Sequence, residues 1–173
     1  DWPEIAAAAH GGTVPGETPG LESDHLFEVP QSSFANGTHA VVLEVDPETG
    51  RVHVLKIWGA HDCGVAINPQ AVTGQIEGAI SMGFGQVLME DMVFEEGQTF
   101  QADLISYPIP TALDLPEIES VCVTTVDPIG PFGAKEAGEG TTLAIVPAIA
   151  NAVYNAVGLR FVESGAAHGD DLL

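Results

Sequence analysis

The stretch His39-Ala-Val-Val-Leu-Glu-Val45, Asp46-Pro-Glu-Thr-Gly50, Arg51-Val-His-Val-Leu-Lys-Ile-Trp58 decides the fold. Both flanks are rich in valine, leucine and isoleucine, which is typical of β-strands. The proline and glycine between them suit the short connection of a β-hairpin. We therefore expect an antiparallel pair of strands, 39–45 and 51–58, with one face on a hydrophobic core.

The chain after this hairpin predicts a long helix over residues 70–91. Its apolar residues follow one helical stripe: Val72, Ile76, Ala79, Ile80, Phe84, Val87 and Leu88. The same segment contains four glycines, at positions 74, 78, 83 and 85. Each lowers helix propensity by up to about 1 kcal/mol relative to alanine, so close packing or a ligand against the bare backbone has to compensate.

The remaining segments predict short strands and one more helix. Residues 92–94 and 99–101 predict a second hairpin, and the three prolines in 105–116 exclude a helix there. Alternation over 117–126 predicts another strand. A final helix is expected over 141–157, in which Pro147 suits a first turn and marks a candidate start.

The N-terminal part adds a short helix over residues 1–10, with Asp1 as its N-cap, and a linker rich in proline, glycine and acidic residues over 12–31. The element order is α-β-β-α-β-β-β-α. We expect an α+β fold with mostly antiparallel strands and two long packed helices, formed by one domain over 1–161. The acidic tail, 162–173, is expected to be frayed.

The composition predicts a folded, acidic protein. Hydrophobic residues make up 45% of the chain and charged residues 17%. The chain contains four Lys and Arg residues and 25 Asp and Glu residues, which gives a net charge of −21. Nucleic acid and anionic membrane surfaces are therefore poor partners. The most apolar stretch, 70–89, is interrupted by polar residues and glycines, so no membrane span is expected. We expect a cytoplasmic protein.

Three adjacent residues, His61, Asp62 and Cys63, stand together as if to bind a metal. On an extended segment their side chains point alternately to opposite sides and do not converge on one ion. Cys63 and Cys122 are far apart in sequence and form no Cys-x-x-Cys pair. We expect no metal ligand from the protein side chains.

The stretch Gly130-Pro-Phe-Gly-Ala-Lys-Glu-Ala-Gly-Glu-Gly140 has the best candidates for chemistry. Glu139 lies between two glycines at a predicted helix entrance, where the helix dipole favours an ionised carboxylate. Burial under a ligand would act in the opposite direction, and this opposition suits a general base. The alternative is a helix-capping glutamate. Lys135 and Glu136 either orient a substrate or pair with each other at the surface.

Together with Ile145–Gly158, this loop resembles the closing segment of the molybdopterin-binding large subunit in the xanthine dehydrogenase and aldehyde oxidase family, the molybdenum hydroxylases. The hairpin 45–50, the segment 62–69 and Gly74-Gln-Ile-Glu-Gly78 are also similar to segments of that subunit, and the resemblance runs from about residue 2 to residue 160. Many members have Gly-Val-Gly-Glu-Pro where this sequence has Glu136-Ala-Gly-Glu-Gly140. That departure leaves the substrate subfamily open.

The resemblance implies that the chain is the C-terminal part of a larger molybdenum-cofactor-binding architecture. It implies that Glu139 is the catalytic base, and that Gly74, Gln75, Ala137 and Gly138 bind the cofactor. The cofactor is molybdenum-pyranopterin, as such or as the cytosine dinucleotide. The implied reaction oxidises an N-heterocycle, purine or aldehyde with water as the oxygen source.

The same resemblance implies a heteromeric complex. Its other members are the remaining part of the molybdopterin-binding subunit, an iron–sulfur subunit with a 2Fe-2S cluster and a flavin subunit with FAD. Two alternatives stay open. The loop sequence Ala-Lys-Glu-Ala-Gly-Glu-Gly is also similar to that of reductive dehydroxylases of aromatic thioesters. The chain could also be a non-catalytic assembly subunit, with Glu139 as a helix cap.

Overall fold

The computed structural model describes residues 1–11, 20–22, 24, 26, 28 and 30–160, which belong to two compact units, Asp1–Pro30 and Gln31–Leu173. The first unit contains helix α1 (Trp2–His10), which begins with the predicted N-cap: Asp1 accepts from the Glu4 amide and Glu4 binds the N-terminal amine in return. The predicted helix over 1–10 is confirmed. The predicted tail, 162–173, lies outside the described residues.

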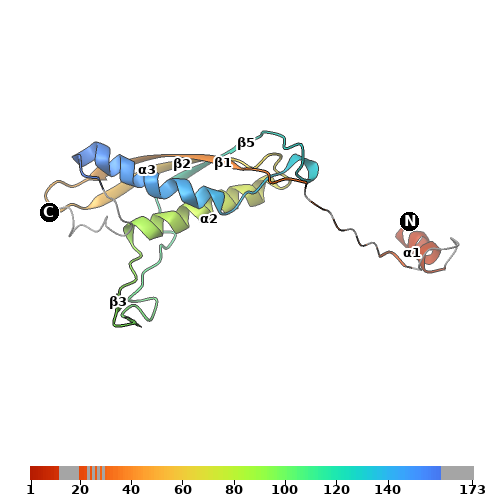
Figure 1. The fold of residues 1–173 in the computed structure, drawn as a ribbon, viewed down its shortest axis with the longest axis horizontal. Helices are drawn as coiled ribbons and strands as arrows, with labels where there is room; N and C mark the ends of the chain where they lie inside the picture. The colour runs from red at the N-terminus through yellow and green to blue at the C-terminus, as the bar shows by residue number, and fades with distance from the viewer. Residues whose placement is uncertain (12–19, 23, 25, 27, 29, 161–173) are drawn as a thin grey trace. The chain divides into compact units, whose positions relative to one another are not determined.

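The second unit is built on a three-stranded sheet with the order β1-β2-β5 (Figure 1). Strands β1 (Asn36–Val45) and β2 (Val52–Asp62) are antiparallel, so the predicted hairpin is confirmed, with both strands longer than expected. The register shifts between Val42 and Leu43. Strand β5 (Glu117–Val123) pairs with β2 in parallel, and this makes β2 the central strand.

Two long helices, α2 (Pro69–Leu88) and α3 (Gly140–Val157), cover one face of this sheet (Figure 1). Helix α3 contacts β1 and α2, and α2 also contacts β5 and β2. Between the helices and the sheet lie side chains with no exposed surface, which form the core: Ile57, Ile76, Ile80, Ile145, Ile149 and Val153. The predicted apolar stripe of α2 is therefore the buried face, and the predicted packing of two long helices is confirmed.

The glycines of α2 divide into two kinds. A Cβ atom on Gly83 would overlap the Ile145 side chain of α3, and one on Gly85 would lie against Pro110 and Glu90. These two glycines allow close packing. Gly74 and Gly78 are different, because a Cβ atom on either would meet no atom within 4 Å. Packing inside the chain therefore explains only half of the glycines in this helix.

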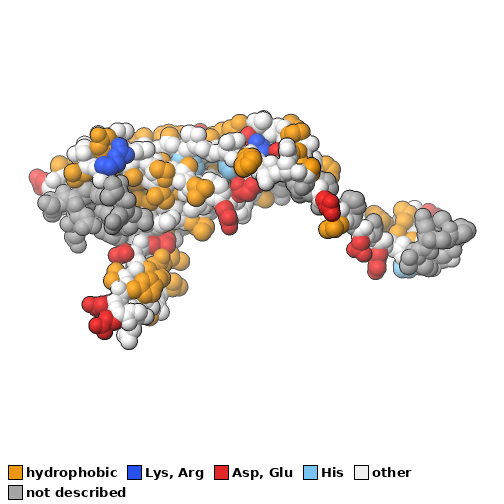
Figure 2. Space-filling model, viewed as in Figure 1, with side chains coloured by type: hydrophobic (Ala, Val, Ile, Leu, Met, Phe, Trp, Pro, Cys, Tyr) orange, Lys and Arg blue, Asp and Glu red, His pale blue; other side chains and the backbone are white. Residues whose placement is uncertain are grey.

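Between α2 and β5 the chain makes a projecting arm, whose tip is a small hairpin of β3 (Phe94–Glu95) and β4 (Gln98–Thr99). This confirms the predicted second hairpin, although its strands are shorter than expected. No helix forms over 105–116, as the prolines require. Hydrophobic side chains are exposed along the arm, among them Phe94 and Phe100, and acidic side chains lie near its tip (Figure 2).

Helix α3 corrects one expectation, since it begins at Gly140 and Pro147 lies inside it. The first two turns persist because Thr141 and Ile145 are fully buried, so packing outweighs the hydrogen bond that proline removes. Among the described residues, α3 is the helix whose length and hydropathy would suffice for a membrane span. One face of α3, with Thr141, Ile145, Ile149 and Val153 buried, packs on β1 and α2.

Candidate functional site

The site lies where β2 and β5 end and α3 begins, and its loop is held by hydrogen bonds to the segment after β2. The Gly133 carbonyl accepts from the amides of Val65 (2.9 Å) and Asp127 (3.1 Å), and the Lys135 amide donates to the Cys63 carbonyl (2.7 Å). A β-bridge joins Gly64 to Ala134. These bonds fix the first half of the loop 130–140 against the core.

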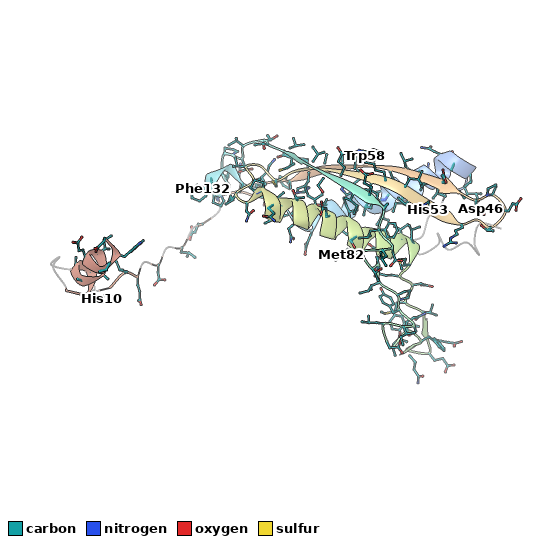
Figure 3. The ribbon with its side chains drawn as sticks, turned by 180° about the vertical axis from the view of Figure 1, so that it is seen from behind. His10, Asp46, His53, Trp58, Met82 and Phe132 are labelled. Carbon is teal, nitrogen blue, oxygen red and sulfur yellow. The ribbon has the colours of Figure 1, made fainter. Side chains whose placement is uncertain are left out.

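Phe132 marks the exposed side of this loop, in the short 3-10 helix η1 (Pro131–Gly133) (Figure 3). Its φ angle is +57°, in the left-handed region that residues other than glycine rarely adopt. Its ring is 87% exposed. Strain of this kind is concentrated at functional sites. The residue type of Phe132 gives no sequence signal for it, because a positive φ is expected of glycine.

A buried ion pair holds the loop to the end of β2. Lys135 Nζ lies 2.8 Å from Asp62 Oδ2, and the two side chains are 6% and 12% exposed. The other Asp62 oxygen accepts from the amides of Gly64 (2.9 Å) and Thr125 (3.1 Å). The Lys135 ammonium is the main reason that the pKa of Asp62 is well below its ordinary value, and these amides lower it further. The expected surface pairing of Lys135 with Glu136 is therefore wrong, because the lysine reaches a buried carboxylate instead.

Glu136 folds back onto the entrance of α3. Its Oε1 accepts from the amide of Gly138 in a very short contact and from that of Gly140 at 3.4 Å. Its carbonyl oxygen lies 3.0 Å from Nε2 of His61, and its Oε2 lies 3.9 Å from the same nitrogen. His61 itself is only 1% exposed. Glu136 thus connects the buried end of β2 with the two glycines around Glu139.

Glu139 occupies the N-cap position of α3, which confirms the predicted helix entrance. Its carboxylate makes no capping hydrogen bond, and the residue is exposed in this chain. The alternative role of a capping glutamate is therefore not what the structure has, since Glu136 supplies the acceptor. The carboxylate of Glu139 is therefore not used as a cap of α3.

The four residues expected to bind a cofactor are brought to one place. Gln75 and Ala137 both line a cavity of about 240 Å³ between α2 and the loop. A Cβ atom on Gly138 would lie 3.5 Å from Gln75 Oε1, so that glycine is adjacent to the same amide. Gly74 precedes Gln75 on α2 and has open space beside it. Residues more than sixty positions apart therefore form one surface.

The side chains of His61, Asp62 and Cys63 go to three different partners. His61 contacts Glu136, Asp62 binds Lys135, and Cys63 Sγ lies 3.5 Å from Cys122 Sγ. Burial raises the pKa of the Cys63 thiol to about 11. In the part of the chain that the structure describes, no three His, Cys, Asp or Glu side chains form a group that could hold a metal ion.

Comparison with known proteins gives consistent matches. Residues 1–116 match the family model described as the molybdopterin cofactor-binding domain. The chain is 29% identical over 163 residues to the carbon monoxide dehydrogenase large chain of Afipia carboxidovorans, covering 94% of this chain and 20% of that protein. It is 35% identical over 143 residues to the nicotine 6-hydroxylase large subunit of Paenarthrobacter nicotinovorans, covering 82% of this chain and 18% of that subunit.

Comparison of the fold with solved structures gives a similar result. The crystal structure of quinoline 2-oxidoreductase from Pseudomonas putida 86 matches with a TM-score of 0.84 and 31% identity over 97% of this chain and 22% of that one. The chain thus spans about a fifth of the length of the relatives it matches. Sequence, family model and fold agree: this chain belongs to the molybdopterin cofactor-binding domain family, as found in proteins of the xanthine dehydrogenase and aldehyde oxidase type.

Proposed function

We propose that this chain supplies the catalytic base, Glu139, and one wall of the pterin site in a molybdenum hydroxylase. The enzyme oxidises an N-heterocycle, a purine or an aldehyde and takes the added oxygen from water. The observation that carries the proposal is the free carboxylate at the N-terminus of α3: Glu139 makes no capping hydrogen bond, while the neighbouring Glu136 accepts from the loop amides. A carboxylate that the fold leaves unused at a helix N-terminus is available to take a proton from a substrate.

The residues present fit a molybdenum-pyranopterin. Gly74 and Gly78 leave the backbone of α2 bare toward open space, which lets a flat ligand approach it closely. Gln75 offers both a donor and acceptor, the combination that a pterin edge requires, and Ala137 and Gly138 keep side chains out of its way. When bound, the cofactor supplies the two-electron redox chemistry.

The protein's own contribution is then positional and electrostatic. The loop amides bound to Glu136, and the Asp62–Lys135 pair behind them, fix the backbone on either side of Glu139. Glu139 is exposed in this chain, so its carboxylate is accessible to a cofactor and a substrate bound against this face.

Residues outside this sequence have to supply the rest of the site, because the chain spans about a fifth of its relatives' length. We propose that residues 1–161 are the C-terminal part of the molybdopterin-binding domain and that the remainder of this subunit completes the cavity. Two of the relatives are called large chain and large subunit, which supports a complex with further subunits. By family analogy these carry a 2Fe-2S cluster and FAD, and the complex is cytoplasmic.

Glu139→Gln tests the proposal in the assembled complex. The substitution keeps the volume and removes the base, so turnover should fall by at least about 10² to 10⁴ while molybdenum and pterin content stay unchanged. Glu44→Gln, at an exposed position on β1, is the matched control and should leave turnover at the parental value. A Glu139→Gln complex that turns over at the parental rate would overturn the assignment.

The assay also separates the two alternatives. Purines, N-heterocycles and aldehydes are assayed for oxidation. Aromatic thioesters are assayed for reductive dehydroxylation by the same complex. A complex that reduces thioesters and oxidises none of the other substrates supports a reductive enzyme on the same fold. A purified complex without molybdenum and pterin supports a role in assembly only.

A further inference from the structure

The entrance of α3 contains two glycines on either side of Glu139, and their amides meet at one side chain. Glu136 Oε1 accepts from Gly138 and from Gly140, whereas the carboxylate of Glu139 between them makes no capping bond. Glycine has the widest choice of backbone conformation of any residue. Without a common acceptor, the three-residue turn Gly138-Glu139-Gly140 would therefore sample many orientations of the carboxylate.

Glu136 is itself fixed from the other side. His61, which is 1% exposed, holds the carbonyl oxygen of Glu136 through Nε2 at 3.0 Å. Lys135, the residue before it, binds Asp62 at 2.8 Å with both side chains buried. Glu136 is thus anchored to the buried end of β2 through its backbone, and its side chain extends that anchorage across Gly138 and Gly140.

We propose that Glu136 is a positioning residue: its carboxylate clamps the amides of Gly138 and Gly140 and thereby sets the direction of Glu139. The inference rests on the proposed function of Glu139, and it assigns a role to the second carboxylate of the loop. Glu136 does not touch the reacting atoms. It acts only through the backbone that carries Glu139.

The clamp also explains how the turn is kept rigid without a proline at position 140. Proline at the first position of a helix rigidifies the entrance and has no amide to satisfy, whereas Gly140 has an amide that needs an acceptor. Glu139 has φ −63° and ψ −31°, a helical conformation that a following proline disfavours. In this chain the Glu136 carboxylate, bound to the Gly138 and Gly140 amides, provides the rigidity and keeps Glu139 in that conformation.

The first test is a double-mutant cycle on the assembled complex, with a substrate that the parent oxidises. Glu136→Ala should lower kcat about 10- to 100-fold with little change in KM, the size of loss expected when a catalytic group is misplaced by about 1 Å. In the Glu139→Gln background, Glu136→Ala should have almost no further effect, because the group it positions is gone. If the two losses multiply, Glu136 does not act through Glu139 and the proposal is refuted.

Hydrogen exchange provides the readout that does not depend on activity. In the Glu136→Ala complex, amide exchange in a peptide containing residues 137–142 should become faster, while a peptide from the centre of α2 stays unchanged. Unaltered exchange over 137–142 would refute the clamp even if turnover fell. Conversely, faster exchange with an active Glu139→Gln enzyme would keep the clamp and refute only the proposed base.

Glu136→Gln is the conservative variant, and it covers the case in which Glu136→Ala does not fold. Glutamine keeps one oxygen that can accept from the two amides, so its kcat should lie between those of the parent and Glu136→Ala. The exposed Glu44→Ala on β1 is the control for the loss of a surface charge and should leave kcat unchanged. If Glu136→Gln lowered kcat as much as Glu136→Ala does, a purely electrostatic effect of Glu136 would account for the loss, and the clamp would be refuted.

Discussion

Replacing Lys135 by methionine removes the cation from the buried ion pair and leaves Asp62 charged beneath the loop. Both side chains are almost fully buried, at 6% and 12% exposure, so water cannot replace the lost partner. Breaking a buried pair on one side typically costs about 3 to 5 kcal/mol. Asp62 keeps two amide donors, from Gly64 and Thr125, so we expect a loss at the lower end, about 3 kcal/mol.

The assay is urea unfolding of the purified protein at pH 7, with Lys56→Met as the matched control. Lys56 also bonds two carboxylates, those of Glu117 and Glu119, but these are 70% and 52% exposed, and the loss should be much smaller. The double variant Lys135→Met with Asp62→Asn should recover most of the stability, because no buried charge is left unpaired.

The pH dependence gives a second check on the same pair. The folded-state pKa of Asp62 is lowered, so the pair contributes stability that is complete above the ordinary aspartate value of 3.8 and is lost as pH falls below it. Without Lys135 the largest cause of the lowered pKa is gone and the pKa of Asp62 rises. The difference in unfolding free energy between parent and variant should therefore narrow as pH falls toward the aspartate range. Equal stability of Lys135→Met and the parent at pH 7 would refute the reasoning.

Two further predictions concern the packing beneath the site. Gly83→Ala should destabilise the protein by about 1 to 3 kcal/mol in urea unfolding, because the new methyl overlaps Ile145, whereas Gly78→Ala, with open space around it, should not destabilise it. The pKa of His39 is lowered by burial and by His61 from its ordinary 6.5, so stability should fall as pH drops below that value. His39→Gln should flatten this fall, and an unchanged slope between pH 7 and 5 would contradict it.

Much of the fold could be predicted because the local signals agree with the packing. The hairpin 39–58 has strand residues around a turn that contains proline and glycine, and the stripe of α2 marks the buried face. The preference of Pro147 for a first turn predicts the wrong start for α3, because the burial of Thr141 and Ile145 before it outweighs that preference. The parallel pairing of β5 with β2 has no local signal, since alternation does not encode strand direction.

The site, like the fold, has features that local sequence predicts and features that it does not. Glu139, Gln75 and Gly138 are proposed as site residues from their motifs alone, because each motif is contiguous in the chain. The partners of Lys135 and Glu136 could not be proposed in this way, because the lysine binds a residue 73 positions away and the glutamate accepts amides that have no side-chain pattern. The choice between a capping and a free Glu139 depends on these partners, so it required the structure.

The parallel pairing of β2 and β5 has a consequence for how this scaffold tolerates change. Because both strands run toward the same edge, the loop that carries Glu139 starts from β5 directly beside the end of β2. The arm that contains β3 and β4 joins the opposite end of β5. Insertions or deletions at the tip of that arm can therefore accumulate over evolution without altering the geometry of the edge that carries Glu139.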